Sequence, residues 1–250
     1  MSWNDLFAHE YDLENVFVFF SLEHYMFVTI ALLGTILILY FAKRIKKWKH
    51  EKSLRISIAS FMIFLEIGYH THNWLNGKFS IPLHVCSAAV IVSIILLITN
   101  SKKVFGYVFF LGLLGGYTAL FLPDMSDYTY INMRYYHFII IHLLIVVIPL
   151  YYYKAYEYRV TSESVKKAFL LLLAMSPLAM YINATMDRNY MFIGEKSETV
   201  LDIMPPWPYY IIVFAILIYS LFYSMYRLSN LSIKKEKTET IYVYKKKTAE

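Results

Sequence analysis

Cysteine and charge are both scarce in this chain, and the two shortages narrow the classes of protein it can belong to. Cys86 is the only cysteine, so it cannot form an internal disulfide. Charged residues make up only 17% of the 250 residues, whereas 58% are apolar and 18% aromatic. The segment before the first apolar run is acidic, which argues against a cleaved signal peptide. This composition is typical of a polytopic membrane protein.

Long apolar segments dominate the sequence. Seven are long enough to cross a bilayer as helices, which takes about 20 residues each. They run over 20–42, 54–76, 82–100, 104–123, 134–154, 166–186 and 208–228. The loops between them are too short to hold a soluble domain. We therefore expect an all-α polytopic membrane protein with an outer N-terminal segment (1–19), a seven-helix transmembrane domain (20–228) and a basic tail (229–250).

Basic residues indicate the orientation of this domain. Twenty of the 24 Lys and Arg residues lie in alternate loops and in the tail, all on one side of the predicted membrane. The positive-inside rule then places the N-terminus outside and the C-terminus inside. The net charge of +6 needs no nucleic-acid partner. The basic loops are expected near anionic lipid, although a solvated, disordered tail fits residues 229–250 about as well.

Ionisable groups inside a bilayer are costly, so those in the outer half are the candidate functional residues. Glu66, His70 and Asn73 share one stripe of the second segment at spacing i, i+4, i+7. Glu66 lies about 10 Å below Asn73 at the helical rise. A carboxylate at that depth must be paired or protonated. We expect a histidine partner, either for function or as a structural hydrogen bond between helices.

A thiol and a second deep histidine complete this set. Cys86 follows Pro82 at the predicted start of the third segment, where a helix N-terminus favours the thiolate. His84 is two residues before Cys86 and does not share its face, so a base for the thiol must come from another helix. His142 lies about 12 Å past Arg134 in the fifth segment and is the strongest candidate. Cys86 as a small buried residue and His142 as a structural hydrogen bond are the competing interpretations.

Further polar residues sit near the outer ends of the segments. Asn183 and Asp187 are spaced i, i+4 and could line the rim of an outward-facing cavity. Arg134 and Arg188 could hold a lipid phosphate. Asn189 and Asp124 are further supporting candidates. The aromatic residues around Trp207 are expected to be mostly interface anchors.

A thiol, a histidine from another helix and an orienting carboxylate are the parts of nucleophilic acyl transfer. The histidine would deprotonate Cys86 and later protonate the leaving alkoxide. A site in the outer half of the bilayer suits a lipid ester, because the acyl tails stay in hydrocarbon. Membrane lipids are therefore the expected substrates.

Three short blocks resemble a known family. Pro82-Leu83-His84-Val85-Cys86 resembles the Pro-Leu-His-Leu-Cys signature of the YwaF-like bacterial membrane proteins. Asn189-Tyr190-Met191-Phe192 and Trp207-Pro208 resemble two further blocks of that family. The resemblance covers nearly the whole chain and its seven-segment plan, and it implies a multi-pass protein of a bacterial cell membrane.

That family is similar to a vertebrate membrane acyltransferase that moves an acyl chain onto lyso-ether-phosphatidylethanolamine through a Cys/His pair. The family histidine lies seven residues before a proline, and His142 stands seven before Pro149. The resemblance thus implies Cys86 as nucleophile and His142 as base, with no cofactor and no metal. Whether the reaction is acyl transfer or ester hydrolysis stays open.

Two other classes also fit the sequence. A metal-dependent intramembrane hydrolase could use a zinc site built from scattered ligands, namely His24, His70, His72, His84 and Asp124. No HExxH spacing supports it. A transporter or a bis-histidine haem protein is the non-catalytic alternative, but the inner half of the predicted helices is almost purely apolar.

Overall fold

The structure, a computed structural model, describes residues 6–7, 17–123, 130–186, 188–194 and 203–247, with side chains described as far as residue 231. Every regular element named within these residues is helical, as the sequence predicts. The elements are α2 (Leu22–Lys46), α3 (Glu51–Leu75), α4 (Val85–Thr99), α5 (Lys102–Tyr107), η1 (Val108–Gly112), α6 (Leu113–Phe121), α7 (Met133–Ala155), α8 (Ser162–Met186), η2 (Tyr190–Phe192) and α9 (Tyr209–Lys247).

These helices occupy the seven predicted segments, because α5, η1 and α6 run on as one helix with a π-helical turn in its middle. Five of the seven are long and apolar enough to cross a membrane: Leu22–Lys46, Lys102–Phe121, Met133–Ala155, Ser162–Met186 and Tyr209–Leu231. The helix α4 is apolar but has only 15 residues. The helix α3 begins with charged residues, which lowers its hydropathy. The fold is that of an all-helical membrane protein.

Two connections differ from the sequence-based expectation. The basic loop predicted between the first two segments is mostly helix, since α2 runs to Lys46 and α3 begins at Glu51. Basic side chains in the last turn of α2 interact favourably with its negative C-terminal end, which explains why the helix continues through them. The backbone of α9 likewise stays helical to Lys247, where a separate tail was predicted from residue 229.

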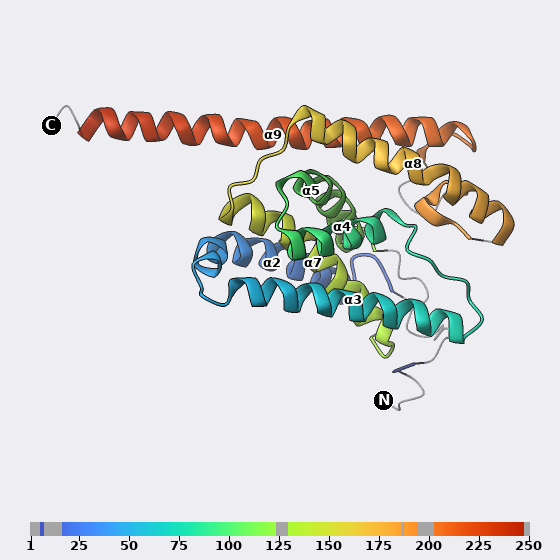
Figure 1. Cartoon of the computed structure of the whole chain (residues 1–250). Coiled ribbons are helices and arrows are strands. Elements are labelled where there is room, and N and C mark those ends of the chain that lie inside the picture. Colours follow the sequence, from blue (N-terminus) through green and yellow to red (C-terminus); the bar gives the residue numbers. More distant parts are fainter. Residues whose placement is uncertain (1–5, 8–16, 124–129, 187, 195–202, 248–250) are drawn as a thin grey trace.

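Figure 1 shows α8 and α9 lying along one side of the molecule, with the other helices beneath them. The link between α2 and α3 and the C-terminal part of α9 lie at one end, on the left. The segment between α3 and α4, and η2, lie at the opposite end. The helices thus alternate in direction and carry the basic connections at one end of the bundle.

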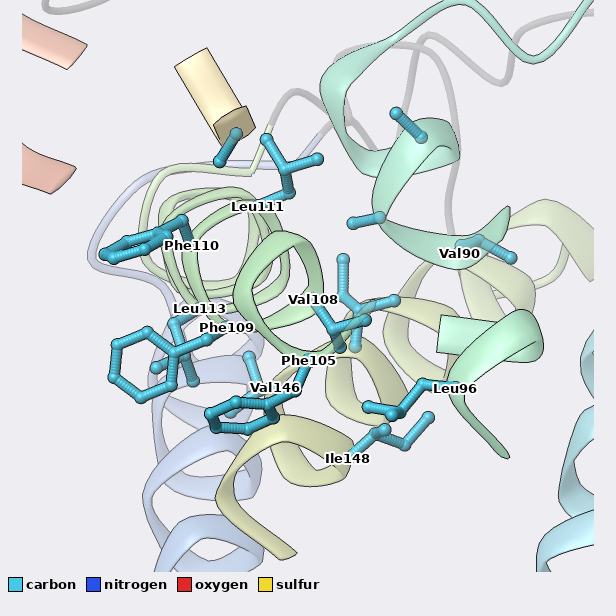
Figure 2. Close-up of a cluster of buried hydrophobic side chains, with 14 of the residues drawn as sticks. Val90, Leu96, Phe105, Val108, Phe109, Phe110, Leu111, Leu113, Val146 and Ile148 are labelled. Atoms are coloured by element: carbon cyan, nitrogen blue, oxygen red, sulfur yellow. The ribbon is translucent and has the colours of Figure 1, made fainter. Parts of the chain in front are cut away.

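The hydrophobic core lies where the helix formed by α5, η1 and α6 packs between α4 and α7 (Figure 2). Buried residues from all three sides meet there, including Leu96, Phe105, Phe110 and Val146. Close approach depends on a glycine, because a Cβ on Gly112 would strike the carbonyl oxygen of Ile145 on α7. The glycines of this segment therefore serve helix packing within the chain.

The end of the bundle that carries the α2–α3 link, which the sequence predicts to be the inner end, holds a buried ion pair that the sequence did not indicate. Glu51 and Arg55 are each 8% exposed, and Arg55 Nε lies 2.8 Å from Glu51 Oε1. The hydroxyls of Tyr151 and Tyr156 both donate to the same carboxylate oxygen at 2.8 Å. Arg55 also donates to the Leu97 carbonyl at the end of α4. The expectation that the inner half is almost purely apolar is therefore wrong at this point, where a charged network ties α3 to α4 and α7.

Candidate active site

Cys86 is the second residue of α4, as the proline-led helix start suggested. The helix begins at Val85, three residues later than the predicted segment, with His84 as its extended N-cap residue. The Cys86 Sγ donates a hydrogen bond to the Gly115 carbonyl on α6 at 3.7 Å. A Cβ on Gly115 would come within 3.3 Å of that sulfur. The absence of a side chain at Gly115 therefore lets the thiol lie directly against the backbone of α6.

The backbone of His142 packs against the next residue of α6. Its ring is buried on α7, and its Nδ1 lies 2.7 Å from the Phe138 carbonyl. A carbonyl only accepts, so Nδ1 carries the proton and Nε2 of the neutral ring has the lone pair. The backbone oxygen of His142 would lie 3.0 Å from a Cβ on Gly116. Cys86 and His142 thus sit against consecutive glycines of one helix.

No hydrogen bond joins Cys86 to His142 within the described part of the chain. The thiol is held on Gly115, and Nε2 of His142 has no hydrogen-bond partner among the described residues. Catalytic hydrogen bonds are often long or unmade before a substrate binds. The contacts with Gly115 and Gly116 place Cys86 and the backbone of His142 beside neighbouring residues of α6.

The depth of Glu66 in the predicted membrane led us to expect one histidine partner. The structure gives this carboxylate two. Its carboxylate oxygens lie 3.7 Å from His70 Nε2 and 3.3 Å from His137 Nε2. The other nitrogen of His70 lies 2.8 Å from the Ser80 hydroxyl.

Arg134 takes part in the same cluster through Tyr69. Its guanidinium donates to the Tyr69 hydroxyl at 2.6 Å and stands 4.9 Å from the centre of that ring. Tyr69 in turn stacks on His137, with ring centroids 4.9 Å apart and 15° between the planes. Through Tyr69, Arg134 therefore stabilises the position of His137, which contacts Glu66. Arg188 differs, since its buried Nε has no hydrogen-bond partner among the described residues.

A short segment around η2 lies against the start of α4. Asn183 binds the backbone of Tyr190 on both sides, donating to its carbonyl at 3.0 Å and accepting from its N–H at 2.7 Å. The Tyr190 hydroxyl accepts from the Ile81 N–H at 3.1 Å, and the Met191 N–H donates to His84 Nδ1 at 3.4 Å. Asn183 therefore holds this segment in place against the end of α8.

Asn189 has a similar local role. Its side-chain oxygen accepts from the Gly194 N–H at 3.2 Å. Between them, Met191 and Phe192 both adopt left-handed backbone conformations, with φ of 58° and 55°. Such conformations are strained for residues with side chains and persist only where the surrounding contacts impose them.

Residues at the start of α9 fasten the other side of this segment. The Tyr210 hydroxyl donates to the Phe192 carbonyl at 2.6 Å, and the Trp207 indole donates to the Ile193 carbonyl at 3.3 Å. Tyr210 is 0% exposed, so the expectation that these aromatics are mostly interface anchors is wrong for it. The three blocks that carry the family resemblance therefore meet in space.

The histidines proposed for a zinc site do not converge. His24 is bound to the Phe121 carbonyl at 2.8 Å, and His72 to the Phe7 carbonyl at 2.9 Å. His70 and His84 face Ser80 and Met191 respectively. Among the described residues, no group of three His, Cys, Asp or Glu side chains could hold a metal ion. Asp124 and Asp187 lie outside the described residues.

Three residues of the site were not found from the sequence. Ser80 lies in the connection before α4, and Tyr69 is one of 24 tyrosines, so neither carries a local signal. Gly115 is a glycine in an apolar segment, which by itself predicts only close helix packing. The contacts of all three depend on how separate helices meet.

The helices and the buried polar groups define this chain as a polytopic membrane protein with a cysteine and histidine centre near one end of its bundle. The chain belongs to the TMEM164 family, whose model matches residues 19–226. It is also 23% identical over 207 residues to an uncharacterized protein of Treponema pallidum (strain Nichols), an alignment that covers 80% of this chain and 84% of the other. No solved structure matches it.

Proposed function

We propose that this protein is a membrane-embedded acyltransferase that moves an acyl chain between lipids through a thioester on Cys86. The observations that carry the proposal are the thiol of Cys86 against Gly115 and the backbone of His142 against Gly116, the next residue of the same helix. We further propose seven membrane spans in the cell membrane of a bacterium, with the N-terminus outside, so that the site lies in the outer half of the bilayer.

In the proposed reaction, Nε2 of His142 accepts the thiol proton as Cys86 Sγ attacks the carbonyl carbon of a lipid ester. The carbon–oxygen bond to the glycerol then breaks, and His142 returns the proton to the departing alkoxide. An acyl-thioester and a lysolipid result. The hydroxyl of a second lysolipid attacks the thioester with His142 again as base, which forms the new ester and restores the thiol.

The surrounding residues support this chemistry by position. We propose that Glu66 supplies the negative charge that stabilises the imidazolium of His142 when the ring takes a proton. His70 and His137 hold Glu66, and Arg134 braces His137 through Tyr69. Arg188 has a buried Nε–H to offer a lipid phosphate. We assign Glu66 as a positioning residue and Arg188 as the headgroup contact.

The test is acyl exchange in proteoliposomes that contain phospholipid and a labelled lysolipid. Wild-type protein should move label into diacyl lipid, Cys86→Ala should abolish this, and His142→Ala should lower it by about a hundredfold or more. Matched controls are Ser87→Ala on α4 and His50→Ala at the inner end, which should both keep wild-type rates. Full exchange by Cys86→Ala would refute the mechanism.

The single cysteine makes the intermediate directly observable. Intact-mass measurement after a short reaction should show one acyl adduct that hydroxylamine removes, and Cys86→Ala should show none. Release of free fatty acid instead of diacyl lipid would mean that water is the acceptor and that the protein is a lipid-ester hydrolase.

A further inference from the structure

The molecule has a groove at the end of the bundle opposite Cys86. Its volume is about 610 Å³, and one face of α2 forms most of it, with Val147 of α7 as the other wall. The lining side chains change along its length from apolar to basic. Gly34, Leu37, Ile38 and Phe41 form the apolar part. Arg44, Ile45, Lys47 and the indole of Trp48 close the other end.

The length of the groove matches one leaflet of a membrane. Gly34 and Arg44 are ten residues apart on a helix, a distance of about 15 Å. The hydrocarbon core of a bilayer is about 30 Å thick, so the apolar part of the groove spans half of it. Arg44 and Lys47 then fall at the headgroup level, next to a tryptophan, which favours that level.

The charges at the basic end of the groove are not neutralised by the residues that the structure describes. Lys43 and Lys46 turn toward the end of α7, where Lys43 pairs with Glu157 at 3.6 Å and Lys46 lies over the Tyr156 ring at 4.5 Å. By contrast, no carboxylate among the described residues pairs with Arg44 or Lys47, which line the groove. A ligand that fits must be anionic at this end and apolar along the rest.

We propose that this groove binds an anionic phospholipid, with the phosphate at Arg44 and Lys47 and one acyl chain along Leu37, Ile38 and Phe41. Charge complementarity and the leaflet-length apolar wall select this occupant over a zwitterionic lipid. The site is separate from Cys86, and its occupancy does not depend on the chemistry proposed there.

The test measures lipid adducts by native mass spectrometry of the full-length protein in nonionic detergent. Phosphatidylglycerol is compared with phosphatidylcholine of the same acyl chains. Wild-type protein should prefer phosphatidylglycerol, and the double variant Arg44→Gln/Lys47→Gln should lose about 25-fold in affinity for it, which corresponds to about 1 kcal/mol for each cation near the headgroup. The matched control Lys102→Gln/Lys103→Gln removes two exposed cations from another inner helix end and should bind as wild type does.

A second pair of variants tests the apolar part. Ile38→Trp fills the groove and should weaken phosphatidylglycerol binding severalfold with both cations in place. Ile36→Trp changes an exposed residue that does not line the groove and should have no effect. Equal binding of the two lipids, equal losses in the two double variants, or unchanged binding by Ile38→Trp would each overturn the proposal.

Discussion

The buried pair of Glu51 and Arg55 offers a sharp test of how the inner end of the bundle is held together. Arg55→Met removes the one cation that pairs, among the described residues, with a carboxylate that is 8% exposed. Breaking a buried pair from one side costs about 3–5 kcal/mol, because the remaining charge is left unpaired. The hydroxyls of Tyr151 and Tyr156 still donate to Glu51. We therefore expect a loss near the lower limit, about 3 kcal/mol of unfolding free energy.

A thermal unfolding assay in detergent measures this cost. For a chain of this length about 3 kcal/mol corresponds to a melting temperature lower by roughly 6–12 °C. The control is Lys43→Gln, which breaks a pair whose side chains are 57% and 67% exposed and should cost less than about 1 kcal/mol. Because the unpaired charge is the cause, adding Glu51→Gln to Arg55→Met should restore part of the stability. If the double variant is less stable than Arg55→Met alone, the reasoning is refuted.

Three further predictions follow from other contacts. Gly112→Ala should destabilise the protein by about 1–3 kcal/mol, because the new methyl group meets the backbone oxygen of Ile145, whereas Gly68→Ala, which meets nothing within 4 Å, should be neutral or stabilising in the same unfolding assay. Asn183→Ala removes both hydrogen bonds to Tyr190 and should speed proteolysis within residues 188–194, while Asn76→Ala, at the end of α3, should not. Burial, and then the hydrogen bond to Glu51, raises the pKa of Tyr156 to about 12. The neutral phenol is therefore favoured by folding, so its contribution should be complete below about pH 10 and lost toward pH 12. The fall in melting temperature over that range should be smaller in Tyr156→Phe.

The positions of the helices could be predicted from the sequence because each depends on a local run of apolar residues. The same holds for Glu66, since the cost of a carboxylate at that depth demands a partner and the helical period places His70 beside it. The contact of His137 with Glu66, in contrast, depends on the packing of α7 against α3. The residues next to His137 in the sequence therefore could not show that it is the second partner of Glu66.

The network around Glu51 and the segment at η2 are further features that could not be predicted from the sequence. Glu51 was taken as part of a basic loop, because nothing in its neighbours shows that α3 begins there and turns it inward. The left-handed residues Met191 and Phe192 are ordinary apolar side chains in the sequence. Their conformation is fixed by Asn183 and Tyr210, which come from helices on either side of the segment. Such features appear only once separate elements are in contact.

The contacts at the start of α4 connect the position of the η2 segment to the position of Cys86. His84 is the N-cap residue of α4 and accepts from Met191, and Ile81 donates to Tyr190. The thiol, two residues past His84, is held on Gly115 and must leave that carbonyl before it can attack an ester. A shift of the η2 segment would therefore move the turn that sets the orientation of Cys86.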